Sequence, residues 1–328
     1  MERLDALTTL DAERAGHWAE LFASAASAPA SLLAAVDAWL HVQRGLPRLD
    51  ATAVPLFQML VGRWAHGERV AFEEGGRRYL FSELELLTAR RAEAWSAAGV
   101  GPKVVVALGR AAGVELMLDL LAVLRLGACA CWVAPLGEPY ERAALGLAQP
   151  DFMVGVDVTS AKSAPKAKAL DDKLAIRAGA PLRALPASYA PKDPCLLVFS
   201  PLRPGKQPGE LSAPSPLFAG QLLRGLARDA AFVWCLRDGD RMAAPDWSCL
   251  RHQPFLALSA VSAGACFHFV TDESLPSSVD GLRGSYRALG VSPEARDALL
   301  QKPPRFKCEL WFRELEASEP DVAWRRLA

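Results

Sequence analysis

Short apolar runs separated by longer helical patterns dominate the stretch from residue 104 to residue 156. The runs VVVAL (104–108), ACACWVA (128–134) and FMVGV (152–156) have the length of buried strands. Between them, VELMLDLLAVLRLG (114–127) and PYERAALGLAQ (139–149) carry apolar residues at helical spacing, and we expect the first to be amphipathic. Buried strands that alternate with helices predict an α/β fold with layered, largely parallel sheets.

The flanking segments extend this pattern. RVAFEEGGRRYLF (69–81) predicts a hairpin with a Gly-Gly turn, and the next segment predicts a helix opened by Ser82. Farther along, CLLVFS (195–200) and ACFHFV (265–270) predict two more strands. The same reasoning predicts helices over 216–229, 253–264 and 292–301, and a short strand over 232–237.

The sequence predicts an N-terminal helical arm over the first 50 residues. Residues 2–44 read as helical segments that break near Pro29, and Ser31 can cap the second one. Its apolar residues recur at helical spacing: Leu32, Leu33, Val36, Trp39 and Leu40. The arm could be a docking element, but a packed helical extension is the commoner outcome. We therefore expect a helical arm (1–50), a first α/β subdomain (51–190) and a second, truncated α/β subdomain (191–328).

Composition limits the partners and the compartment. The chain has 328 residues, of which 51% are hydrophobic, and its 37 basic and 37 acidic side chains balance. No global field would attract nucleic acid or an anionic membrane. There is no apolar run of about 18 residues, so no membrane span is expected. The N-terminus is too acidic and too interrupted for a signal peptide, which favours a soluble, cytoplasmic protein.

Cysteines and histidines give no metal or catalytic pattern. The seven cysteines include no C-x-x-C pair, and we interpret them as buried thiols: Cys129, Cys131, Cys195, Cys235, Cys249, Cys266 and Cys308. His252 and His268 stand alone and are interpreted as packed or solvated side chains, not as bases. We assign no catalytic residue and no metal ligand.

The segment VFSPLRPGKQPGEL (198–211) is the candidate nucleotide loop. An apolar strand leads into Gly205, Lys206 and Gly209, and such residues suit a loop that surrounds phosphate. Prolines at 201, 204 and 208 have no N–H to donate and fix φ, which argues against phosphate binding. Two interpretations stay open, a residual phosphate contact and an ordinary surface turn, and we favour the turn.

From about residue 54 to its end, the chain resembles the N-terminal portion of the adenylate-forming (AMP-binding) superfamily, which includes acyl-CoA synthetases. The resemblance rests on motifs in order. A hairpin precedes a "Y-x-E-L" helix (Phe81, Glu83, Leu84), a "G-V-x-x-G-D-x-V" turn follows at 99–104, and a helix ends in a "K-x-G-A" turn at 125–128. The family's phosphate loop, Y-T-S-G-S-T-G-x-P-K-G, aligns with residues 199–209.

Within that loop, Ser200, Gly205, Lys206 and Gly209 are the candidate cofactor-binding residues. Residues 201–204 (Pro-Leu-Arg-Pro) replace S-G-S-T, and Pro208 replaces the lysine. The family's later segments, a "Y-G-x-T-E" loop and a C-terminal domain with a catalytic lysine, find no counterpart in the sequence.

The resemblance implies two alternative functions. One is a degenerate synthetase-like protein without adenylation activity that acts as a binding or scaffold subunit. The other is an active or split acyl-CoA synthetase-like ligase that uses ATP and Mg²⁺, with its C-terminal half supplied in trans. The loop chemistry favours the first, so the sequence leaves enzyme activity open and leans against it. No cofactor is assigned with certainty, and ATP or AMP with Mg²⁺ is expected if activity is retained. We also expect self-association, or binding to a protein partner, through the truncation edge.

Overall fold

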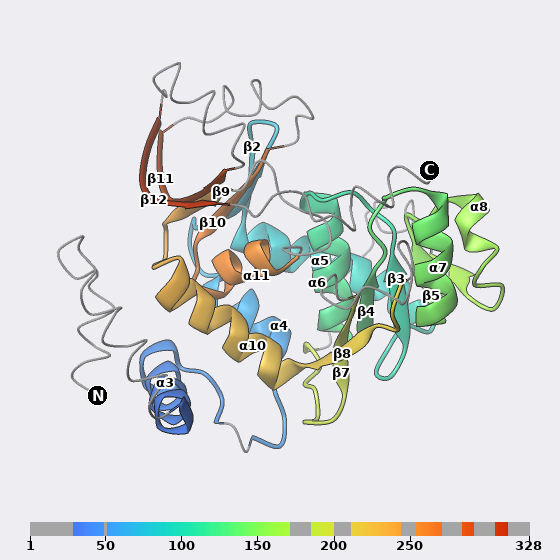
Figure 1. Cartoon of the computed structure of the whole chain (residues 1–328), viewed down its shortest axis with the longest axis horizontal. Coiled ribbons are helices and arrows are strands. Elements are labelled where there is room, and N and C mark those ends of the chain that lie inside the picture. The colour runs from blue at the N-terminus through green and yellow to red at the C-terminus, as the bar shows by residue number, and fades with distance from the viewer. Residues whose placement is uncertain are drawn as a thin grey trace.

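The computed structural model describes residues 29–48, 51–170, 185–199, 211–243, 254–270, 284–291 and 306–313. Two six-stranded sheets with helices between and beside them form its body (Figure 1). The α/β fold with layered, largely parallel sheets is confirmed. In the described ranges, no helix is both long and apolar enough to cross a bilayer.

Sheet 1 has the strand order β12-β11-β9-β10-β1-β2. All neighbouring strands are parallel except β1 and β2, which form the predicted antiparallel hairpin. Its turn is Gly75-Gly76, and both glycines have positive φ (56° and 81°), as the twist of a two-residue hairpin requires. The strands are β1 (Val70–Glu74), β2 (Arg77–Leu80), β9 (Arg241–Ala243), β10 (Cys266–Phe269), β11 (Gly284–Val291) and β12 (Phe306–Arg313).

Sheet 2 has the order β6-β5-β3-β4-β7-β8. Its neighbouring strands are parallel except for β7 and β8, which are antiparallel. The strands are β3 (Val105–Leu108), β4 (Cys129–Trp132), β5 (Phe152–Val154), β6 (Lys168–Ala169), β7 (Pro194–Val198) and β8 (Ser215–Phe218). Crossover helices join the parallel strands, which explains the alternation of strands and helices in the sequence.

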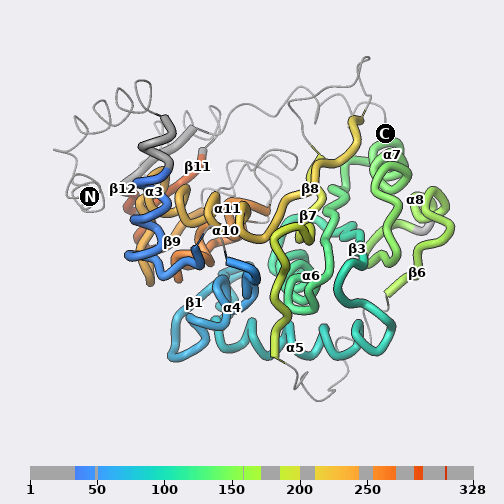
Figure 2. The backbone as a smooth tube through the Cα atoms, turned by 90° about the horizontal axis from the view of Figure 1, so that it is seen from below, coloured from blue at the N-terminus to red at the C-terminus, as the bar shows by residue number. Residues whose placement is uncertain are grey.

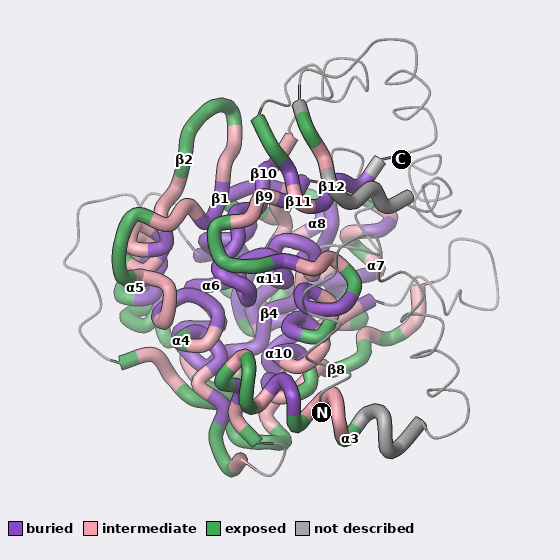
Figure 3. Tube along the Cα trace, turned by 90° about the vertical axis from the view of Figure 1, so that its left-hand side faces the viewer, coloured by how far each residue is buried: buried purple, intermediate pink, exposed green. Residues whose placement is uncertain are grey.

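Helix α6 (Val114–Arg125) lies between the two sheets and is buried around nearly its whole circumference (Figure 3). The amphipathic character expected for 114–127 is therefore wrong. Because both sheets and neighbouring helices surround α6, nearly every face of the helix is buried, and its residues 116–124 are apolar apart from Asp119. Its C-terminal turn uses Gly127 (φ 71°), where an added Cβ would lie 2.9 Å from the Cβ of Ala187.

One hydrophobic core fills the space between the sheets. Alternate residues of one strand face different cores, so Val106 belongs to this central core and Ala107 to a second one. Other helices also contribute to the central core, among them α4 (Leu56–Leu60), α10 (Ala219–Arg228) and α11 (Phe255–Ser262), with the one-turn η2 (Gly62–Trp64) after α4.

The second core lies on the other face of sheet 2. Helix α7 (Glu138–Ala148) supplies Tyr140, Ala144 and Leu145, and the one-turn α8 (Val158–Ala161) follows β5. Because cores cover sheet 2 on both faces, its central strands are almost continuously apolar.

Helix α5 (Phe81–Ala97) begins one residue before the predicted capping residue. Ser82 lies inside the first turn, so it does not open the helix as expected. Instead, the Glu83 carboxylate accepts a hydrogen bond of 2.8 Å from the backbone amide of Leu80. A glutamate at the third helical position can satisfy the amide that precedes the helix, and here it does so without a polar partner at the cap.

Two expected elements after residue 211 differ from the structure. The segment Pro216-Leu217-Phe218 belongs to strand β8, and the predicted helix begins only at Ala219. The short strand expected at 232–237 is wrong, because Asp229–Val233 forms a π-helical turn, η3, that continues α10. Strand β11 was not recognised as a strand from the sequence.

The arm is described from residue 29, where α3 (Pro29–Arg44) begins, and it packs against α10 (Figure 2). Trp39 is buried and its ring lies 5.0 Å from that of Phe232. Arg224 of α10 forms an ion pair with Asp37 and donates to the Pro47 carbonyl at 2.7 Å. For its described part, the arm is a packed helical extension.

The sheets divide the chain differently from the expected segments 51–190 and 191–328. Sheet 1 joins β1 and β2 to β9–β12, and sheet 2 joins β3–β6 to β7 and β8, so each sheet takes strands from both segments. The division into domains stays a prediction. The helix expected over 292–301 lies outside the described residues, as does His252.

Candidate functional site

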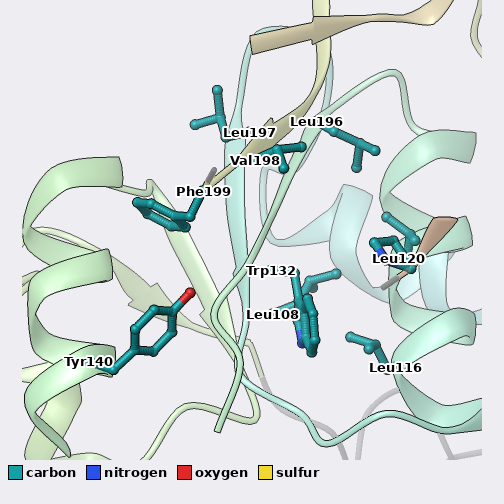
Figure 4. Close-up of a pocket in the computed structure, with 10 residues that line it drawn as sticks. Leu108, Leu116, Leu120, Trp132, Tyr140, Leu196, Leu197, Val198 and Phe199 are labelled. Atoms are coloured by element: carbon teal, nitrogen blue, oxygen red, sulfur yellow. The ribbon is translucent and has the colours of Figure 1, made fainter. Parts of the chain in front are cut away.

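A crevice opens at the carboxyl ends of β4 and β7. From β4 the chain leaves toward α7 and β5 on one side, whereas β7 is followed by β8 on the other side. Ligands of open parallel sheets bind where neighbouring strands connect in opposite directions, which makes this the candidate site. Figure 4 shows its lining: Leu108, Leu116, Leu120, Trp132, Tyr140, Leu196, Leu197, Val198, Phe199 and Pro254.

The described part of this crevice is apolar and small. Its volume is about 30 Å³, roughly the space of one water molecule in the liquid. Phe199 and Tyr140 meet edge to face with ring centres 6.4 Å apart. Trp132 is fixed by its indole N–H, which donates to the Arg110 carbonyl at 3.0 Å. No charged side chain of the described residues lines the crevice, so these residues offer an apolar surface and no phosphate ligand.

Phe199 is the last described residue before the candidate nucleotide loop and is buried at the crevice. The four residues predicted to bind a cofactor, Ser200, Gly205, Lys206 and Gly209, lie outside the described residues. Their assignment stays a prediction. Within the described ranges, no group of three or more His, Cys, Asp or Glu side chains could hold a metal ion.

A buried ionic network lies next to the crevice and was missed in the sequence. Asp119 of α6 has no exposed side-chain area and forms ion pairs with Arg91 of α5 and Arg110, which follows β3. Burial raises the pKa of Asp119, while the two arginines act in the opposite direction. The available signal was a single charged residue in the otherwise apolar run 116–124, because a buried carboxylate needs a buried cation.

This ionic network also helps to position Trp132, which lines the crevice. Arg110 pairs through its side chain with Asp119, and through its carbonyl it accepts the hydrogen bond from Trp132. The same arginine therefore links the buried carboxylate to an aromatic residue of the lining.

Sheet 1 is joined to the start of α6 by Glu74. The Glu74 carboxylate accepts a hydrogen bond from the Val114 amide at 3.2 Å. Burial raises the pKa of Glu74, the hydrogen bond lowers it, and Glu115 raises it further. An added Cβ on Gly113 would lie 2.5 Å from a Glu74 carboxylate oxygen, so a side chain there would have to displace the carboxylate.

A second polar cluster crosses four strands of sheet 1. Arg241 of β9 donates to Glu73 of β1 at 2.7 Å and to the hydroxyl of Tyr286 of β11 at 3.2 Å. That hydroxyl lies 2.7 Å from Nδ1 of His268 on β10, and the two rings are stacked. Because the arginine can only donate, the tyrosine O–H is available to donate to a neutral His268. His268 is thus a packed histidine, as expected.

Four cysteines are buried thiols, as predicted. Burial raises the pKa of Cys129 and of Cys266 to about 12, and raises those of Cys131 and Cys195 further. Cys235 and Cys308 are half-buried. Thiols with raised pKa values are poor nucleophiles, which fits a packing role.

The fold matches those of adenylate-forming enzymes. The luciferase-like enzyme from the mealworm Zophobas morio superposes with a TM-score of 0.62 over 81% of this chain and 67% of its own, at 16% identity. ATP-bound MatB from Rhodopseudomonas palustris gives 0.61 over 76% of this chain and 51% of its own, at 18% identity. o-Succinylbenzoate CoA synthetase (MenE) from Bacillus subtilis gives 0.62, with 75% and 50% covered, at 15% identity.

The chain has the fold of the N-terminal part of these enzymes. The fold implied by the resemblance of the sequence motifs is confirmed. The chain spans about half the length of MatB and MenE. No protein-family model matches the sequence, and no curated protein matches it either.

Proposed function

We propose that this protein keeps the architecture of an adenylate-forming enzyme without adenylation activity, and that it acts as a binding or scaffold subunit. The observation that carries the proposal is the loop that follows Phe199. Three prolines there remove three backbone donors, and Pro208 stands where the related motif has lysine. A triphosphate needs both the donors and the positive charge.

The described lining of the crevice supports this proposal. It consists of aliphatic and aromatic side chains and proline, and it leaves room for about one water molecule. Any charged contact to a nucleotide would therefore have to come from residues other than this lining.

The rival function is an active or split acyl-CoA synthetase-like ligase that binds ATP and Mg²⁺. It is favoured by the fold, which is shared with enzymes such as MatB, whose structure contains ATP. Under this alternative, a second polypeptide would supply the remaining catalytic groups, and Ser200, Gly205, Lys206 and Gly209 would contact the nucleotide.

Isothermal titration with ATP and Mg²⁺, together with carboxylate-dependent pyrophosphate exchange, separates the two functions. We expect no heat of binding at micromolar ATP and no exchange. Micromolar binding with exchange would establish the rival.

A loop variant provides the matched positive control. In it, residues 201–204 become Ser-Gly-Ser-Thr and Pro208 becomes lysine, which restores donors and charge. If the prolines are what prevents binding, this variant gains ATP affinity that the native chain lacks. Equal, weak binding by both chains would show that the loop is not the cause.

A further inference from the structure

An open groove lies at the amino ends of β3 and β5. The crevice lies at the other end of the parallel strands of sheet 2, at the carboxyl ends of β4 and β7. Its volume is about 590 Å³, which falls in the range of small-molecule sites, roughly 300–1,000 Å³. The residues that line it come from the end of α5, the end of α7 and the segment between α8 and β6. Its lining comprises Ala98, Gly99, Val104, Gly146 and the segments 149–152 and 163–168.

Small residues keep this groove open. Gly146 lies inside α7, where a Cβ would meet nothing within 4 Å. A glycine in a helix interior costs about 1 kcal/mol relative to alanine, so helix stability does not explain its presence. Ala98, Gly99 and Ala164 are similarly small.

The groove combines an apolar floor with a basic rim. Phe152 (7% exposed) and the buried Pro150 contribute to the floor. Lys166 and Lys168 are exposed at the rim, and the Lys168 ammonium lies 5.9 Å from the centre of the Phe152 ring. The lining includes one acid, Asp151, which accepts a hydrogen bond from the Val105 amide at 2.8 Å.

Several carbonyls at the helix ends near the groove are hydrogen-bonded within the backbone. At the end of α5, the amides of Ala98, Gly99 and Val100 donate to the carbonyls of the last turn at 2.9–3.2 Å. The Gln149 amide does the same for α7, with a hydrogen bond of 2.9 Å to Leu145. Since these carbonyls are satisfied within the backbone, their negative ends contribute less at the groove.

We propose that this groove binds a small organic anion, that is, a carboxylate, sulfonate or phosphate attached to an apolar body. The body would lie on Phe152, Val104 and Pro150, and the anionic group would contact Lys166 and Lys168. The site is separate from the crevice, so it does not depend on the proposed function.

The probe is 1-anilinonaphthalene-8-sulfonate, an aromatic sulfonate whose fluorescence rises when it binds an apolar surface. We expect saturable binding to the folded native chain, and about tenfold weaker binding to a Lys166→Ala/Lys168→Ala variant, because two nearby charges are lost. Lys192→Ala removes an exposed lysine outside the groove and is expected to bind like the native chain. Gly146→Leu should block the groove, whereas Gly146→Ala should not; circular dichroism confirms that each variant is folded.

Competition identifies the anion. Octanoate and octyl phosphate each test one anionic group, and displacement of the probe by either supports the proposal and names the group. Octanol carries the same apolar chain without charge and should displace little. The proposal is overturned if the native chain binds no probe, if Gly146→Leu and the lysine variant bind it as the native chain does, or if octanol competes as well as octanoate.

Discussion

Asp119 shows how one residue can organise the space between two sheets. It is fully buried, and Arg91 and Arg110 approach it from different elements. Burial alone would favour the neutral acid, so the arginines are what make an ionised carboxylate tolerable there. Through Arg110, the same pair reaches the Trp132 side of the crevice.

Replacing Asp119 with asparagine should destabilise the protein strongly. The change leaves Arg110 without its buried counter-charge and leaves Arg91 paired only with the exposed Glu115, and removing one partner of a buried pair typically costs about 3–5 kcal/mol. Urea unfolding measures the loss. As the control, Glu138→Gln breaks only the exposed pair with Arg142, which is worth about 0.5 kcal/mol. If Asp119→Asn costs no more than this control, the network is not structural.

His268 should make stability depend on pH. Burial lowers its pKa; Glu73 raises it and Arg241 lowers it, with Tyr286, Cys266 and Arg78 as the other titratable or charged groups of this cluster. A histidine whose pKa is lower in the folded state favours the neutral form. The contribution of His268 to the free energy of unfolding is therefore fully present above the pKa of the unfolded-state histidine, about 6.5. It is lost as the pH falls toward the pKa of His268 in the folded protein.

The measurement is the free energy of unfolding at pH 7.5 and at pH 5.5, for the native chain and for His268→Phe. We expect the native chain to lose more stability on acidification, by at most about 1.4 kcal/mol per pH unit in this window. The same pH dependence in both proteins would contradict the role of His268.

The buried thiols should resist alkylation. Burial keeps Cys129, Cys131, Cys195 and Cys266 protonated and inaccessible at pH 8. Iodoacetamide followed by peptide mass spectrometry should find these four unmodified in the native protein and modified in urea. Labelling of any of them at the rate of an unfolded thiol would show that the surrounding core opens readily.

At the scale of elements, the edge strands are protected against further pairing. Sheet 1 ends at β2, which exposes Arg77 and Arg78, and sheet 2 ends at the two-residue β6, which exposes Lys168. The other edge of sheet 2, β8, contains Pro216. Charged residues, short strands and proline are the usual means of preventing a sheet edge from adding another chain. At these three edges, self-association by strand pairing is disfavoured.

Attachment of α3 should depend on Arg224. This side chain joins α10 to Asp37 and to the carbonyl of Pro47. Arg224→Ala should release the arm and speed limited proteolysis within residues 29–48, while the core stays resistant. Arg228→Ala, on the same helix, removes only an exposed pair with Asp229 and should leave the cleavage rate unchanged. Equal rates in both variants would show that Trp39 and its apolar neighbours hold the arm alone.

At the scale of the whole molecule, the two sheets share one core. Helix α6 contacts both, and Glu74 of sheet 1 satisfies the first amide of that helix. Neither sheet could keep its inner face buried if the other unfolded. We therefore expect a single unfolding transition in urea, with coincident curves from far-ultraviolet circular dichroism and tryptophan fluorescence. Two separated transitions would mean that the sheets fold independently.

The sequence by itself determined the local elements and the fold class. Strands β3, β4 and β5 and the helices between them follow from apolar runs of characteristic length, and the Gly75-Gly76 turn follows from backbone sterics. These signals depend on neighbours along the chain. Such local signals predict the wrong element for the π-helical turn at 229–233 and for strand β8. At both places, tertiary packing overrides short-range propensity.

Only the tertiary structure decided which distant residues meet. The burial of α6 on all sides, the pairing of Arg91 with Asp119 and the joining of β1 to β10 depend on strand order, which local periodicity does not encode. The same holds for the groove at Lys166 and Lys168, whose lining comes from segments that are far apart in the sequence. The spacing of apolar residues along the chain specifies each helix or strand. The contacts between helices and strands are decided by how these elements pack around the common hydrophobic core.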